Sequence, residues 1–336
     1  MSDSQTYHLD RLYYGVLVDE NQQQSSRPGV IARTASVTPA QIAECLRVGQ
    51  ILPPASKDAS ADMPGTLALL QSNTTNFILT KAQRSDAGYP QIMYVLVPRE
   101  VIRQLGGNVL MFRALGLAPM PAFVSASADL PPFEFRAPPP PERENQLDAL
   151  FDLMLFCQDS LPIIEGMLAA LVRGWPLVIS NSPRSITQRL QFVQGLLSLL
   201  PVPARTGITF ATHVTDPAAS PAQLMFAARV DGAEGTLVYD WARGELLTKP
   251  PRDAYSRYII SQLRLDPSLV VDQTEELART TVWRAMQRER LSSVLAWVAR
   301  RAAVDRTVRD GQPADRALVA SILREDPTLS PEARLA

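Results

Sequence analysis

The most regular hydrophobic pattern in this chain lies between residues 161 and 230. Apolar residues recur there every three or four positions over 162–174 and again over 186–200, which is the period of a helix with one buried face. Between these helices, the short apolar run 177–179 is typical of a strand that is buried on both sides. An alternation of helices and strands favours an α/β layer, which we expect to form the core of the larger domain. Further strands are predicted over 206–214, 223–230 and 236–241.

The first 118 residues show a different pattern, in which short strands dominate. Thr38 and Pro39 are typical of a helix cap and a first helical residue, so a helix is expected from this point. One antiparallel sheet with helices on one face satisfies the predicted order with short connections. That order is strand, strand, helix, three strands and two helices, over 9–19, 30–37, 38–49, 66–71, 76–84, 91–97, 99–106 and 109–115.

Residues 119–145 are predicted to form a linker between two domains. The four prolines at 138–141 favour an extended polyproline conformation with little helix or strand potential. A stiff linker is the preferred interpretation, and docking of this proline-rich run on an SH3-like partner is the alternative. Phe123, Phe133 and Phe135 indicate that part of the linker lies on a domain surface.

The end of the chain is predicted to be helical. Thr274 is the expected cap of one helix that continues towards Ala303. The predicted fold class is therefore α/β (α+β), with an antiparallel sheet layer over 1–118, the linker over 119–145, a small α/β domain over 146–265 and a helical region over 266–336. The candidate core positions of the C-terminal helix are Leu277, Val282, Met286, Leu291, Val294, Leu295 and Val298.

Composition places the chain among ordinary globular proteins, because 46% of its 336 residues are hydrophobic and its net charge is -1. So small a net charge gives no global field that draws the protein to nucleic acid or membrane. The N-terminal residues do not resemble a signal peptide, and no apolar stretch approaches the roughly 18 residues of a membrane span, so the cytoplasm is the expected compartment. Cys45 and Cys157 lie among apolar residues of predicted helices and are expected to be buried, reduced thiols.

The sequence contains no recognisable reaction chemistry. His8 and His213 are its two histidines, and no Cys/His spacing fits zinc. The GxSxG, GxxxxGKS/T and GxGxxG motifs are absent, which excludes a serine hydrolase of that type, a standard P-loop nucleotide hydrolase and a dinucleotide fold with its usual glycines. We therefore expect no metal and no cofactor, and a function other than catalysis.

His213 is the one weak candidate for a catalytic residue. Strict alternation in the strand 206–214 places Ile208, Phe210 and Val214 on one face and His213 on the other. A histidine near the end of a core strand can act as a general base. The alternative is a strand-end histidine hydrogen-bonded to a loop. We favour this alternative, because no nucleophile or second acid is identifiable.

The turn 181–185 links a predicted strand to a predicted helix. Ser182 and Pro183 fit a helix cap and a first-turn proline. Together with Arg184, a helix N-terminus here is also a candidate site for an anion. Simple capping is the preferred interpretation, because the glycines that allow close approach of a phosphate are missing.

Arginines are concentrated between residues 279 and 309, an interval that contains eight arginines and only two acidic residues. Such an excess is an electrostatic footprint for nucleic acid or for an acidic partner. We favour a solvated or partner-facing surface, since interleaved stacking aromatics are lacking apart from Trp283 and Trp297. The predicted partner-binding residues are Arg279, Arg284, Arg288, Arg290, Arg300 and Arg301.

Two segments carry a resemblance to a known family. In residues 174–216, a short strand precedes a long leucine-rich helix that ends at Leu-Leu-Pro, and an aromatic strand with the sequence FATH follows. This segment resembles the bacterial GTPase-associated protein family, and residues 13–46 are similar in layout to the opening domain of that family. The order of elements in the first domain resembles a longin-type layer. A longin-like layer, a linker and an α/β domain also resemble the DENN modules of eukaryotes, which regulate small GTPases.

The resemblance implies a non-enzymatic adaptor or regulator of a small GTPase, or of a multi-protein signalling or conflict complex. Such a protein acts through contacts with a partner that is encoded nearby, and the resemblance transfers no catalytic residue. Two alternatives stay open: an enzyme with an unrecognised site around His213, and binding of nucleic acid through the arginine-rich helices of 279–309. The sequence gives no indication of the oligomeric state.

Overall fold

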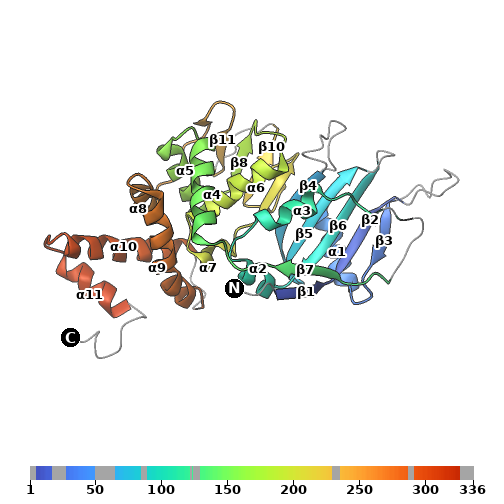
Figure 1. The fold of residues 1–336 in the computed structure, drawn as a ribbon, viewed down its shortest axis with the longest axis horizontal. Coiled ribbons are helices and arrows are strands. Elements are labelled where there is room, and N and C mark those ends of the chain that lie inside the picture. The colour runs from blue at the N-terminus through green and yellow to red at the C-terminus, as the bar shows by residue number, and fades with distance from the viewer. Residues whose placement is uncertain are drawn as a thin grey trace.

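The computed structural model describes residues 5–16, 28–49, 65–84, 89–121, 123, 129–228, 235–286 and 291–325. Within these ranges the chain forms a mixed α/β fold with eleven α-helices, a ten-stranded mixed sheet and a separate two-stranded antiparallel sheet (Figure 1). The α/β class predicted from the sequence is confirmed at this level.

A single sheet contains strands from both predicted domains, in the order β12-β11-β8-β10-β9-β4-β5-β6-β2-β3. The sheet is continuous across the two predicted domains, whose boundaries stay a prediction. The antiparallel strands of the first part are β2 (Arg11–Gly15), β3 (Gly29–Arg33), β4 (Gly65–Ser72), β5 (Asn76–Arg84) and β6 (Pro90–Val97). The parallel strands of the second part are β8 (Leu177–Ser180), β9 (Phe210–Val214), β10 (Leu224–Ala227) and β11 (Leu237–Asp240), with β12 (Glu245–Leu246) antiparallel at the edge.

The two halves of the sheet meet where β4 pairs antiparallel with β9. Beyond this short ladder, the backbone N–H of Leu67 donates to the buried hydroxyl of Thr212 at 2.9 Å. The register between β9 and β10 shifts here, so β9 contains one extra residue, as in a β-bulge. Val214 consequently packs with Ala211 in the second core, and the prediction that it shares a face with Phe210 was wrong.

The helices cover the two faces of the sheet unequally. Helix α1 (Pro39–Gly49) packs on one face, where Cys45 and Val48 contribute to the smaller core. The other face carries the larger core, to which all the other α-helices contribute except α3, whose partly buried side chains pack against it. These elements are α2 (Arg99–Leu105), η1 (Leu110–Phe112), α3 (Arg113–Leu117), α4 (Arg143–Phe156), α5 (Leu161–Arg173), α6 (Ile186–Ser198), α7 (Val202–Arg205), α8 (Ala254–Leu263), α9 (Pro267–Met286), α10 (Leu291–Arg309) and α11 (Arg316–Glu325).

The predicted linker contains regular structure that the sequence did not predict. Strand β7 (Phe133–Ala137) pairs antiparallel with β1 (Gln5–Leu9), and the predicted strand 9–19 is interrupted at Asp10, between β1 and β2. Apolar and charged residues alternate in β7, which is the pattern of a strand with one buried face. Phe135 is buried, so this part of the predicted linker belongs to the folded core. The four prolines at 138–141, for which the polyproline conformation was predicted, follow this strand and lie outside any helix or strand.

Helix ends show which capping signals the fold uses. The predicted start at Thr38 is confirmed, because its hydroxyl accepts from the backbone N–H of Gln41 while the Gln41 side chain accepts from the N–H of Thr38, a capping box. Helix α6 is capped by Ser185, whose hydroxyl accepts from the backbone N–H of Gln188 at 3.4 Å, so the prediction of Ser182 as the cap was wrong.

The first helix of the C-terminal region begins earlier than the predicted cap at Thr274. Thr274 lies inside α9, and its hydroxyl donates to the carbonyl of Val271. The cap of α9 is Asp266 instead, whose carboxylate accepts from the backbone N–H of Ser268. Pro267 is the first helical residue. The predicted single helix corresponds to α9 and α10, and residues 287–290 between them lie outside the described residues. Four of the predicted core positions are confirmed as buried, namely Leu277, Val294, Leu295 and Val298. The side chains of the other three, Val282, Met286 and Leu291, lie outside the described residues.

Cys45 and Cys157 are both buried and unpaired, as predicted. Burial raises the pKa of each thiol to about 12, which keeps it protonated near neutral pH. Among the described residues, no single helix is long and apolar enough to cross a membrane, and α4 and α5 pass such a test only as a pair that is bent by 113°.

Helix α4 packs directly on α6, and Gly195 makes this close contact possible. A Cβ atom at position 195 would lie 2.6 Å from the carbonyl oxygen of Ala149 and 2.6 Å from the Cβ of Leu153. A glycine inside a helix costs about 1 kcal/mol relative to alanine, so its presence in α6 indicates that the close contact outweighs helix propensity.

The substitution Gly195→Ala is expected to destabilise the fold by about 1–2 kcal/mol, because overpacking of the α4–α6 contact exceeds the gain in helix propensity. Urea unfolding followed by circular dichroism measures this change. Gly207→Ala is the control, since no atom lies within 4 Å of a Cβ at that position. A Gly195→Ala variant that is as stable as the wild type would contradict the packing argument.

Candidate functional site

His213 lies at the bulge of β9, and its ring is partly buried. Within the described ranges no hydrogen bond reaches the ring, and the hydrogen bonds at this point of the strand are made by Thr212. Burial, and secondly the charge of Arg189, lowers the pKa of His213 to about 4. A base with so low a pKa is poorly matched to proton abstraction near neutral pH.

Arg189 of α6 holds the turn 181–185 against the sheet. Its Nε donates to the carbonyl of Pro183 at 2.9 Å, and its Nη1 donates to the carbonyl of Thr212. The guanidinium also lies 5.4 Å from the ring centroid of Phe226. The buried arginine therefore connects the turn 181–185, α6 and β9, which is a structural role.

Asn181 and Asp240 occupy the same edge of the parallel strands. The Nδ2 of Asn181 donates to the Oδ2 of Asp240 at 2.8 Å, and the backbone N–H of Arg243 donates to the Oδ1 of Asp240. These bonds close the turn after β11, and they occupy both oxygens of the buried carboxylate.

The predicted arginine-rich surface is described in part. Arg300 is exposed, and Arg301 lies 3.6 Å from the carboxylate of Asp305 and 6.0 Å from the ring centroid of Trp297. Arg288 and Arg290 lie outside the described residues, as do the side chains of Arg279 and Arg284. The proposed role of these six arginines in partner binding stays a prediction.

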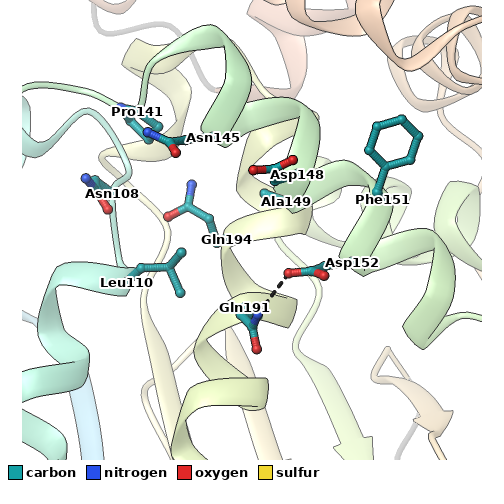
Figure 2. A pocket seen from close by; sticks show the side chains of 10 residues that line it. All are labelled: Asn108, Leu110, Pro141, Asn145, Asp148, Ala149, Phe151, Asp152, Gln191 and Gln194. Atoms are coloured by element: carbon teal, nitrogen blue, oxygen red, sulfur yellow. Dashed lines mark hydrogen bonds between the residues drawn. The ribbon is translucent and has the colours of Figure 1, made fainter.

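A cavity of about 590 Å³ lies between α4, α6 and the segment that contains η1. Its volume falls within the roughly 300–1,000 Å³ of ligand sites in proteins. Figure 2 shows how α4 and α6 contribute side chains from opposite sides. The lining residues are Asn108, Leu110, Pro141, Asn145, Asp148, Ala149, Phe151, Asp152, Gln191 and Gln194.

The cavity is acidic, because its lining includes two carboxylates and no basic side chain. Asp148 and Asp152 are one turn apart on α4, and Asp152 accepts from the Nε2 of Gln191 at 2.9 Å. Burial raises the pKa of Asp152, the hydrogen bond from Gln191 lowers it, and the charge of Asp148 raises it. The net effect is a raised pKa of Asp152, mainly because of burial.

Gln194 is the buried polar residue of the cavity. It is 1% exposed, and its Oε1 accepts from the backbone N–H of Val109 at 2.9 Å, whereas its Nε2 has no hydrogen-bond partner among the described residues. Figure 2 shows this nitrogen turned towards Asn145. A buried amide donor without a partner costs about 1–3 kcal/mol, so an acceptor that enters the cavity would be stabilising.

Two large apolar side chains are exposed beside this cavity. Phe151, which lines its rim, is 55% exposed, and Leu155 on the next turn of α4 is 71% exposed. The outer face of α4 therefore combines an apolar pair with an acidic cavity. Exposed apolar groups next to polar ones are typical of surfaces that bind other proteins.

The N-terminus of α4 is held in place by buried polar contacts. The Nε2 of Gln146 donates to the carbonyl of Pro141 at 3.0 Å, and the Nη2 of Arg205 donates to the Oε1 of Gln146 at 2.7 Å. Arg205 is 2% exposed and also donates to the carbonyl of Leu200. The cavity is thus built on a helix that is fixed at its start and along its inner face.

This site was not predicted from the sequence. Part of it is visible in the sequence, because Glu144, Asp148 and Asp152 recur every four residues and so share one face of the helix. The apolar residues of this helix are too many for one buried face, so some of them must be exposed. Gln194 could not be identified from its position in α6, since its cavity forms only through contacts with distant segments.

No protein-family model matches the sequence, and a search of curated proteins finds no relative.

We expect the His213 ring to titrate near pH 4, which NMR can measure with His8→Gln to assign the signals. In the unfolded chain the ring has a pKa of about 6.5. Between this value and pH 4 the unfolded chain binds more protons than the folded chain, so the free energy of unfolding falls as the pH falls through this range. Above about pH 6.5 the full free energy of unfolding is present. His213→Gln is expected to remove up to about 3 kcal/mol of this pH dependence. Titration of the native ring near 6.5 would contradict the expectation.

Proposed function

We propose that this protein is a non-enzymatic adaptor or regulator, and that its partner binds on the outer face of α4. The observation that carries this proposal is the exposed pair of Phe151 and Leu155 beside the acidic cavity. Burial of such side chains against a partner contributes about 1.5–3 kcal/mol for each of them. The helix is also fixed from within, so a partner would bind a surface that is already formed.

A small GTPase encoded nearby is the partner that we propose, with another member of the same signalling or conflict complex as the wider class. This choice rests on the resemblance of residues 13–46 and 174–216 to the bacterial GTPase-associated family. The order of elements supports it, because β2, β3, α1, β4, β5, β6, α2 and α3 follow one another as a longin-like layer requires. We propose a longin-like first part and a DENN-like second part on the same grounds.

The proposal is tested with purified small GTPases encoded by neighbouring genes, each loaded with GDP or with a GTP analogue. Surface plasmon resonance measures binding to the full chain, and release of a fluorescent nucleotide measures exchange. We expect one of these GTPases to bind saturably and with a preference for one nucleotide state. The proposal fails if none of the neighbouring proteins, GTPases or others, binds the full chain.

The double substitution Phe151→Ala and Leu155→Ala is expected to weaken partner binding at least about tenfold, because it removes apolar contact worth at least about 1.4 kcal/mol. Leu265→Ala with Val308→Ala is the matched control, since these side chains are 73% and 61% exposed outside α4. Equal binding by the double variant and the wild type would exclude the outer face of α4 as the docking surface.

A further inference from the structure

We propose that the cavity between α4 and α6 binds an arginine side chain carried by a peptide segment of the partner. The inference rests on the proposed function, because it names the chemistry by which a partner protein binds this face. It is drawn from three features of the cavity. These are a pair of carboxylates without a counter-charge, a buried amide donor without an acceptor, and an apolar rim.

The carboxylates of Asp148 and Asp152 favour a cation as the ligand of this cavity. Like charges one helical turn apart destabilise a helix by about 0.2–0.5 kcal/mol. Among the described residues no basic side chain pairs with either carboxylate, and Arg143, the one arginine of α4, pairs with Asp272 of α9. A guanidinium placed between the two carboxylates relieves their repulsion, and its planar set of donors suits two carboxylates better than an ammonium group does.

The amide of Gln194 requires an acceptor, which a free cation does not offer. Its Nε2 is buried and unpartnered, and it lies on the α6 side of the same cavity (Figure 2). A peptide carries a backbone carbonyl beside each of its side chains. A segment that places an arginine between the carboxylates can therefore direct a carbonyl at Gln194, so a peptide satisfies both groups at once.

The rim of the cavity indicates which residue accompanies the arginine. Phe151 lines the cavity, and Leu155 is exposed one turn further along α4. A segment that crosses this rim buries both side chains only if it carries an apolar residue next to its arginine. The expected ligand is therefore an arginine flanked by an apolar residue in a partner protein, rather than a small diffusible cation.

The probe is a five-residue peptide, acetylated and amidated, with an arginine between two leucines. Its binding to the full chain is measured by NMR and by calorimetry, beside the same peptide with citrulline in place of arginine and beside agmatine. Citrulline keeps the shape of arginine and removes its charge. We expect citrulline to weaken binding at least about tenfold, as loss of a charge-assisted hydrogen bond does.

The double substitution Asp148→Asn and Asp152→Asn is expected to weaken binding of the arginine peptide at least about tenfold, while the thermal midpoint stays equal or rises because the like charges are removed. A residue pair with a merely structural role would lower the midpoint. The control is Asp129→Asn with Glu134→Gln, which removes the same charge from exposed positions outside the cavity. This control is expected to bind the peptide like the wild type.

Several outcomes would overturn the inference. These are equal binding of the citrulline and arginine peptides, undiminished binding by the Asp148→Asn and Asp152→Asn variant, and absence of saturable binding at millimolar peptide. Agmatine that binds as tightly as the peptide would overturn the assignment to a protein segment. If the peptide binds but no neighbouring protein does, the proposed partner fails while the cavity assignment stands. If a GTPase binds the double asparagine variant unchanged, the cavity assignment fails while the proposed function stands.

Discussion

The pairing of β4 with β9 is the interaction on which the single sheet depends, because it joins an antiparallel layer to a parallel one. The ladder itself is short, and the hydroxyl of Thr212 extends it by accepting from the backbone N–H of Leu67. The bulge at this point presents the Thr212 carbonyl to the buried guanidinium of Arg189. Thr212 thus links both halves of the sheet to α6. Helix α6 in turn packs closely on α4 at Gly195, and this contact determines where α4 and its cavity lie.

The sequence predicted those elements whose signals are local, and it failed where distant segments decide. The period of apolar residues identified most helices and strands, and Thr38 was identified as a cap because its partner Gln41 is three residues away. The bulge in β9 could not be predicted, since the extra residue is defined by register against β10. Strand β7 was missed because neighbouring prolines dominated the pattern, although its partner strand β1 satisfies its backbone groups.

The candidate site shows the same division. The spacing of Asp148 and Asp152 is visible in the sequence, but the sequence does not show that no basic side chain of the described residues pairs with these carboxylates. That property depends on Arg143, which pairs with Asp272 more than a hundred residues away. The orphan donor of Gln194 is likewise a product of the fold, since its other end is occupied by the backbone of Val109. His213 had the more conspicuous sequence context, yet burial lowers the pKa of its ring to about 4.

The contrast between the two faces of α4 supports the proposal that its outer face binds a partner. On the inner face, Gly195 allows close packing, and Arg205 and Gln146 fix the helix start with buried hydrogen bonds. The outer face has features that do not favour stability: like charges one turn apart and two exposed apolar side chains. Proteins keep such unfavourable arrangements where function requires them. The proposed partner would offset both features, because it would bring a positive charge to the carboxylates and cover the two apolar side chains.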